Sequence, residues 1–204
     1  MSRTQHNTIK ALATMLPIWI VAACIPLLLS ECNSNDYIAT PRPTAYPRIA
    51  LHDSTFTAVA LPRISLQVST SAIASLHEKE NATWIDINYP NYNATIHATY
   101  TPVDNTTLNA TLANRSERIA LDLGDTTFEN ISINNPDGTS ANIYATRNNM
   151  VTPLMFLATD HKSWILSGAV AFEGTSAINY DSVAPIVNTL QRDLIHTLQN
   201  LSQQ

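Results

Sequence analysis

Cys24 and Cys32 are the side chains best placed to do chemistry, and both lie at the end of a long uncharged segment. Arg3 and Lys10 precede this segment, and residues 11–30 carry no charge. A basic start followed by an apolar run is typical of an export signal. A cysteine at the end of such a signal can be acylated when the signal is removed, so the sequence predicts lipid attachment at one of the two cysteines.

An uncleaved transmembrane helix is the alternative interpretation of the same segment. The run from Ala11 to Leu29 approaches the roughly 20 residues that span a bilayer. Pro17 and Pro26 interrupt this run, and the cysteines at its end favour processing. We therefore expect a cleaved lipoprotein signal.

The local residues leave the position of the cut open. Val21-Ala22-Ala23 before Cys24 is a run of small residues that a lipoprotein signal peptidase accepts, whereas Glu31 is awkward immediately before Cys32. The residues after the cut favour the opposite choice, because Cys24 is followed by an apolar stretch and Cys32 by a polar one. Both cysteines remain candidates on these grounds.

The other reactive residue types do not form a recognisable site. The six histidines stand singly, without a His-x-x-x-His pair or a cysteine partner, so we predict no metal and no cofactor. Asp160, His161 and Ser163 resemble a hydrolytic set by type, but neighbouring residues on a strand point to opposite faces, and a turn is the simpler interpretation. Only four glycines occur, and no phosphate-binding loop is present. We predict no catalytic residues and no enzyme.

The charge balance argues against a nucleic-acid partner. The chain has 11 basic and 16 acidic residues, and a cut before Cys32 removes two of the former and one of the latter. Binding to a phosphate backbone needs clustered Lys and Arg. Only Lys79 and Lys162 remain as lysines after the cut, so we expect no nucleic-acid binding.

Behind the signal, most of the chain predicts β-structure. Pro41, Pro43 and Pro47 punctuate a polar stretch that favours an extended tether. Beyond it, short runs rich in β-branched and aromatic residues alternate with turn signals. The expected strands are Phe56–Leu61, Ile64–Val68, Thr83–Tyr89, Ala94–Thr101, Thr126–Ile133, Ala141–Thr146, Pro153–Thr159 and Trp164–Phe172. We expect turns at Pro90-Asn91-Tyr92-Asn93 and at Asn135-Pro136-Asp137-Gly138.

Two segments have helical spacing. Leu108, Leu112 and Ile119 indicate a central helix from Asn105 to about Leu121. Near the C-terminus an apolar stripe recurs at i, i+3, i+4 and i+7, with a cap at Asp181 or Ser182 and Pro185 in the first turn. The stripe comprises Val183, Ile186, Val187, Leu190, Leu194, Ile195, Leu198 and Leu201. The predicted fold class is therefore α+β, an antiparallel sheet packed by a central and a C-terminal helix.

Several short sequence motifs, taken in their order along the chain, resemble those of the gliding-motility lipoprotein D (GldD) family of the Bacteroidota. The Pro-basic-Pro stretch, aromatic residue and Arg-Ile of Pro41-Arg42-Pro43-Thr44-Ala45-Tyr46-Pro47-Arg48-Ile49 are similar to its opening signature. Asn88-Tyr89-Pro90 and Asn93–Tyr100 are similar to its paired central strands. Its C-terminal block is matched by Ala158-Thr159-Asp160, Ser167–Phe172 and Asn179–Pro185.

The resemblance implies a lipid-anchored envelope protein of the gliding and type IX secretion machinery, facing the periplasm. It also implies a PsbP/Mog1-like sandwich fold. The resemblance favours acylation at Cys32, with Cys24 as the alternative, because the acylated cysteine of the family lies shortly before the Pro-basic-Pro motif. The implied organisation is a signal peptide at 1–31, a polar Pro-rich tether at 32–47 and one α+β domain at 48–204.

The leading functional hypothesis is a non-catalytic assembly factor that is held on the membrane by its lipid and binds other envelope proteins. The first alternative is a ligand-binding or glycan-binding lipoprotein in which Trp84, Tyr89, Tyr92 and Tyr100 stack on a sugar, although packing in the core is the simpler role for these rings. The second alternative is an envelope hydrolase.

Overall fold

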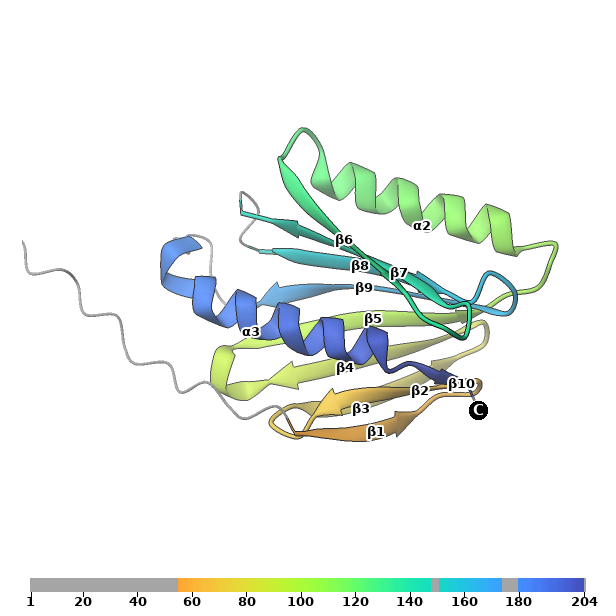
Figure 1. Ribbon diagram of the computed structural model, residues 1–204, viewed down its shortest axis with the longest axis horizontal. Coiled ribbons are helices and arrows are strands. Elements are labelled where there is room, and N and C mark those ends of the chain that lie inside the picture. The colour runs from red at the N-terminus through yellow and green to blue at the C-terminus, as the bar shows by residue number, and fades with distance from the viewer. Residues whose placement is uncertain (1–54, 148–150, 174–179, 204) are drawn as a thin grey trace, which may run out of the picture. The chain divides into compact units, whose positions relative to one another are not determined.

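A seven-stranded antiparallel sheet forms the centre of the computed structural model, which describes residues 55–147, 151–173 and 180–203 (Figure 1). Its strand order is β3-β4-β5-β9-β8-β7-β6. The strands are β3 (Ile73–Lys79), β4 (Ala82–Tyr89), β5 (Ala94–Pro102), β6 (Phe128–Asn134), β7 (Ser140–Thr146), β8 (Leu154–Thr159) and β9 (Trp164–Phe172). The smaller sheet has the order β1-β2-β10, with β1 at Phe56–Ala60, β2 at Ile64–Ser69 and β10 at Ser202–Gln203.

The chain path explains which part of the large sheet is covered. Strands β3 to β5 form one meander, and β6 to β9 form a second meander that returns to pair β9 with β5. Helix α2 (Leu108–Leu123) connects β5 to β6, which is the far edge of the sheet. It therefore crosses one face of the second meander, where it contacts β8 and β9 (Figure 1). No helix among the described residues crosses the same face over β3, β4 and β5.

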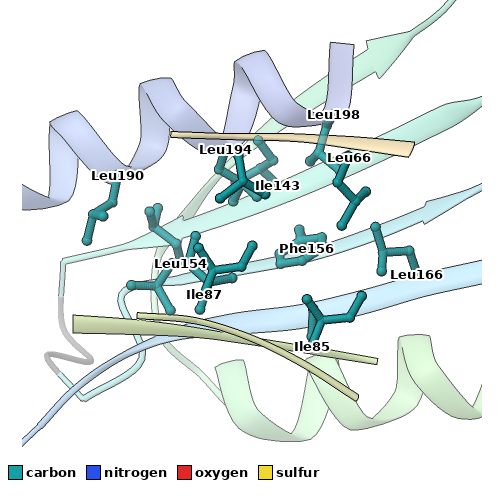
Figure 2. Packing of buried hydrophobic residues seen from close by; sticks show 14 of the residues in the cluster. Leu66, Ile85, Ile87, Ile143, Leu154, Phe156, Leu166, Leu190, Leu194 and Leu198 are labelled. Carbon is teal, nitrogen blue, oxygen red and sulfur yellow. The ribbon is translucent and has the colours of Figure 1, made fainter. Parts of the chain in front are cut away.

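The opposite face of the sheet holds the main core. Helix α3 (Tyr180–Gln199) lies on it and contacts β2, β6 and β8. In Figure 2, Leu190, Leu194 and Leu198 of α3 face the buried aliphatic side chains of the strands. Each of the three leucines is at most 2 % exposed. The apolar stripe of α3 is therefore buried against the sheet, as its spacing predicts, because burial of apolar surface is the main favourable contribution to the free energy of folding.

Helix α2 closes a second, smaller core on its own face of the sheet. Ile119 and Leu123 are buried against Met155, Leu157 and Ile165 of β8 and β9. Within the described part of the chain, neither helix is long and apolar enough to cross a membrane.

The predicted α+β fold class is confirmed, and all eight expected strands are present. The strand β3 was missed, because an edge strand that is exposed on both sides lacks the alternation on which the prediction depends. The short strand β10 was missed as well.

Both helix starts differ from the prediction. Helix α2 begins at Leu108 instead of Asn105, because the Asp104 carboxylate accepts the backbone N–H groups of Thr106 and Thr107 and holds these residues in a turn. These hydrogen bonds also keep the pKa of Asp104 well below its usual value. Helix α3 begins at Tyr180, which places Pro185 inside the helix and not in its first turn.

Candidate functional site

The face of β3, β4 and β5 on the side of α2 is left largely open by the described residues, because α2 makes its extensive contacts with β8 and β9. Strand alternation directs every second residue to it, and the register places these residues side by side. We call this surface the open face. It carries Ile73, Ser75, His77, Lys79, Trp84, Asp86, Asn88, Thr95, His97 and Thr99.

Trp84 is the largest side chain on the open face. Its neighbours Ile85 and Ile87 on β4 alternate into the core, whereas the indole is 51 % exposed. The ammonium of Lys79 lies 4.9 Å from the centre of the indole ring. This cation–π contact restrains the ring without covering it, so a flat aromatic surface remains available to solvent.

Asp86 lies between two histidines that come from the two neighbouring strands. His97 Nδ1 donates a hydrogen bond to the Asp86 carboxylate at 2.7 Å. On the other side, His77 Nε2 is 3.8 Å from the second carboxylate oxygen. These histidines are isolated in the sequence, but the pairing of β3, β4 and β5 brings both of them next to Asp86. Because the turn pairs Tyr89 with Ala94, Asp86 must fall opposite His97.

Helix α2 supplies the second wall of the site. Arg115 and Arg118 are three residues apart and therefore lie on one side of the helix. Burial lowers the pKa of Arg115, and the charge of Arg118 lowers it further. The Arg115 guanidinium donates to the Thr101 hydroxyl at 3.4 Å, and neither arginine forms an ion pair with a described residue. Both cations thus retain donors that a ligand could use.

Between this helix and the strands runs a groove of ≈ 370 Å³, which we call the Trp84 groove. Met155 of β8 and Gly168 and Ala169 of β9 line it on the sheet. Its walls are formed by Trp84, Asp86, His97, Thr99, Arg115, Arg118, Ile119 and Asp122. The groove combines one aromatic surface with cationic donors and carboxylate acceptors, which is the composition of a surface that binds polar partners.

The groove suits binding better than acid–base chemistry. Asp86 is 39 % exposed, so water screens its charge. Catalytic groups gain most from a site that excludes water, where their charges and dipoles act at low dielectric. The His97–Asp86 pair sits on a sheet surface instead, where its fixed geometry can orient a bound group.

The three tyrosines predicted as possible sugar-stacking residues have other positions. Tyr89, Tyr92 and Tyr100 are at most 5 % exposed and belong to the main core. The Tyr89 hydroxyl donates to Asp193 of α3 at 3.3 Å, and burial together with this carboxylate raises the pKa of Tyr89. Burial also raises the pKa of Tyr100. Of the four aromatic residues, Trp84 alone can meet a ligand on the surface.

Asp160, His161 and Ser163 form the turn between β8 and β9 that the sequence predicts. The Asp160 carboxylate accepts the backbone N–H groups of Lys162, Ser163 and Trp164 and the Ser163 hydroxyl. His161 has a left-handed backbone (φ 58) and its ring bonds to Ser140 instead. The three residues therefore close a turn and do not make a hydrolytic triad.

The remaining predicted sites are only partly described. Among the described residues no three His, Cys, Asp or Glu side chains are arranged to hold a metal. His196 stacks on Phe56, with ring centres 3.7 Å apart. Cys24, Cys32, the predicted signal peptide at 1–31 and the predicted tether at 32–47 lie outside the described residues.

Comparison with known families identifies a matching family model. The family model described as gliding motility lipoprotein GldD matches residues 35–202, which include both helices and the whole of the large sheet. No individual curated protein matches the chain.

Proposed function

Because the chain belongs to the gliding motility lipoprotein GldD family, we propose that it serves as a non-catalytic assembly factor whose Trp84 groove binds a partner protein. Membership of this family makes it an envelope lipoprotein of the gliding machinery. The proposal extends this role to the linked type IX secretion machinery and to an orientation toward the periplasm.

The half-exposed indole of Trp84 is the observation that carries the proposal. Trp is enriched among the residues that dominate the energy of protein interfaces. Here the ring is restrained by Lys79 and lines the same groove as two arginines that form no ion pair with a described residue. Arg is the other residue type enriched at interface centres, because its planar donors pair with carboxylates and its stem covers apolar surface. A partner would find an aromatic contact and directional polar contacts in the same groove.

The partner is reached from the membrane surface. We propose that Cys32 carries the lipid, with Cys24 as the alternative, and that residues 32–47 act as the tether. The test is metabolic labelling with a fatty acid in Cys32→Ala and Cys24→Ala. We expect label and membrane association to be lost in Cys32→Ala and retained in Cys24→Ala. Label retained in Cys32→Ala would transfer the attachment site to Cys24.

The groove is tested by crosslinking in intact envelopes, followed by purification of the full-length protein and identification of what it carries. Trp84→Ala removes the exposed ring while leaving the buried face of β4 unchanged. Leu121→Ala is the matched control, because Leu121 is 73 % exposed on α2 and does not line the groove. We expect Trp84→Ala to lose the crosslinked partner at normal abundance and Leu121→Ala to retain it. Retention of the partner by Trp84→Ala would contradict the proposal.

The same variants separate the alternatives. If Trp84→Ala abolishes capture by envelope glycan but spares the crosslinked proteins, the glycan-binding alternative gains support. An envelope hydrolase would instead lose turnover on Asp86→Asn or His97→Gln while protein crosslinks persisted. Immunoblots of each variant exclude loss of the protein as the cause.

A further inference from the structure

Among the described residues, strand β3 is an edge of the large sheet and pairs with β4 alone. It forms seven consecutive pairs with β4, without a bulge, and contains neither proline nor glycine. Among the described elements its one extensive neighbour is β4. Natural proteins usually protect such an edge with a short strand, a bulge, a proline, charged side chains or a covering element, because its free N–H and C=O groups can pair with another chain. Strand β3 carries its formal charges at its C-terminal end, on Glu78 and Lys79, and its first five residues have none.

Strand β3 exposes two apolar residues. Leu76 is 40 % exposed and Ile73 is 61 % exposed, and neither belongs to a core cluster. The opposite edge strand, β6, also exposes an apolar residue, Phe128 at 45 %, but this ring packs edge-on against Tyr144 and α3 contacts the strand. Strand β3 therefore has apolar surface that a neighbouring strand could bury.

The sequence of β3 is complementary to itself when read in the antiparallel direction. With Leu76 opposite Leu76 of a second copy, Ser75 falls opposite His77, Ala74 opposite Glu78 and Ile73 opposite Lys79. No like charges oppose one another, and the exposed leucines meet at the centre. Directly opposite residues also share a face of the sheet, so this register keeps core-facing residues opposite core-facing residues.

We propose that two copies of this chain pair through β3, antiparallel and in register about Leu76, so that their large sheets become one continuous sheet. A two-fold axis perpendicular to the sheet relates the copies and makes the interface self-complementary. This operation leaves both open faces on the same side. The dimer therefore presents two Trp84 grooves on one surface, on either side of the paired β3 strands.

Cysteine crosslinking in membranes tests both the pairing and its register. Both native cysteines precede residue 33, so a cysteine placed in β3 is unique within the folded region. The variants are Leu76→Cys, Ala74→Cys and the double variant Ala74→Cys/Glu78→Cys, each in the full-length chain and treated with a mild oxidant. In the proposed register the two Leu76 Cα atoms lie about 5 Å apart, within the range of a disulfide, whereas the two Ala74 Cα atoms lie roughly 14 Å apart.

We expect Leu76→Cys to form a disulfide-linked dimer in most molecules, at least tenfold more than Ala74→Cys. The double variant should restore crosslinking, because Ala74 of one copy faces Glu78 of the other. The chain without an added cysteine measures any background from Cys24 and Cys32. Equal crosslinking of Leu76→Cys and Ala74→Cys, or none in either, would overturn the proposal.

Discussion

Leu194→Ala is expected to destabilise the protein severely, because Leu194 is 2 % exposed at the centre of the α3 stripe. The substitution removes three buried carbons, which costs about 2.4 kcal/mol at roughly 0.8 kcal/mol each. The residual cavity adds to this cost, since Leu→Ala in cores spans about 2–5 kcal/mol. Helix α3 contacts three different strands, β2, β6 and β8, so we expect the surroundings of Leu194 to relax only in part. We therefore expect a loss of about 3–4 kcal/mol, beside a total of roughly 5–15 kcal/mol.

Urea denaturation of the purified lipoprotein, followed by tryptophan fluorescence, measures this loss as a change in the free energy of unfolding. Leu121→Ala is the matched control, because the same three carbons are removed from a side chain that is 73 % exposed. It should change the free energy of unfolding by less than about 0.5 kcal/mol. If Leu194→Ala behaved like Leu121→Ala, the α3 stripe would not be core and would instead have to be a docking face.

Three further predictions concern other parts of the fold. Gly168→Ala should lower stability by about 1–3 kcal/mol in thermal denaturation, because its Cβ would lie 2.5 Å from the His97 carbonyl oxygen and 2.8 Å from the Phe156 ring; an unchanged Tm would refute this close approach. Burial acts to raise the pKa of Asp160, but the hydrogen bonds from Ser163, Lys162 and Trp164 outweigh it and lower this pKa. The ionised Asp160 carboxylate therefore adds to the free energy of unfolding above its unfolded pKa near 4, and this stabilisation is lost as pH falls through the lower folded pKa. We expect Asp160→Asn to flatten the acid-side decline in the free energy of unfolding, measured by denaturation across pH. Chelators should leave Tm unchanged, and a sharp drop in calorimetry would reveal a metal site.

The elements with strong local signals could be predicted from the sequence. The Asp137-Gly138 pair demands a positive φ, and Gly138 adopts φ 87 in the turn between β6 and β7. The leucines of α3 recur at helical spacing, so burial of one side of this helix followed directly. In both cases a few neighbouring residues carry the information, which is why spacing alone was sufficient.

The Trp84 groove could be predicted only in part, because it depends on the path of the chain over longer distances. The alternation around Trp84 marks it as facing away from Ile85, but it does not say whether a helix covers it. Whether a helix covers Trp84 depends on the direction in which α2 crosses the sheet, toward β6 and not toward β3. No local sequence pattern determines this direction. The approach of His97 to Asp86 was not predicted either, although the register of the β4–β5 hairpin places the two residues opposite each other.

The pairing of β5 with β9 governs the order in which this protein can fold after export. Every other pairing in the large sheet joins strands that are consecutive along the chain, whereas Ala98 pairs with Gly168, seventy residues later. Closing such a long loop is entropically costly and slows folding relative to local hairpins. Each meander can form early, but until β9 arrives the edge of β5 is open to pairing with other chains. The newly exported protein is therefore most vulnerable to aggregation at the unpaired edge of β5, before β9 pairs with it. A factor that shields β5 would protect the protein during this interval.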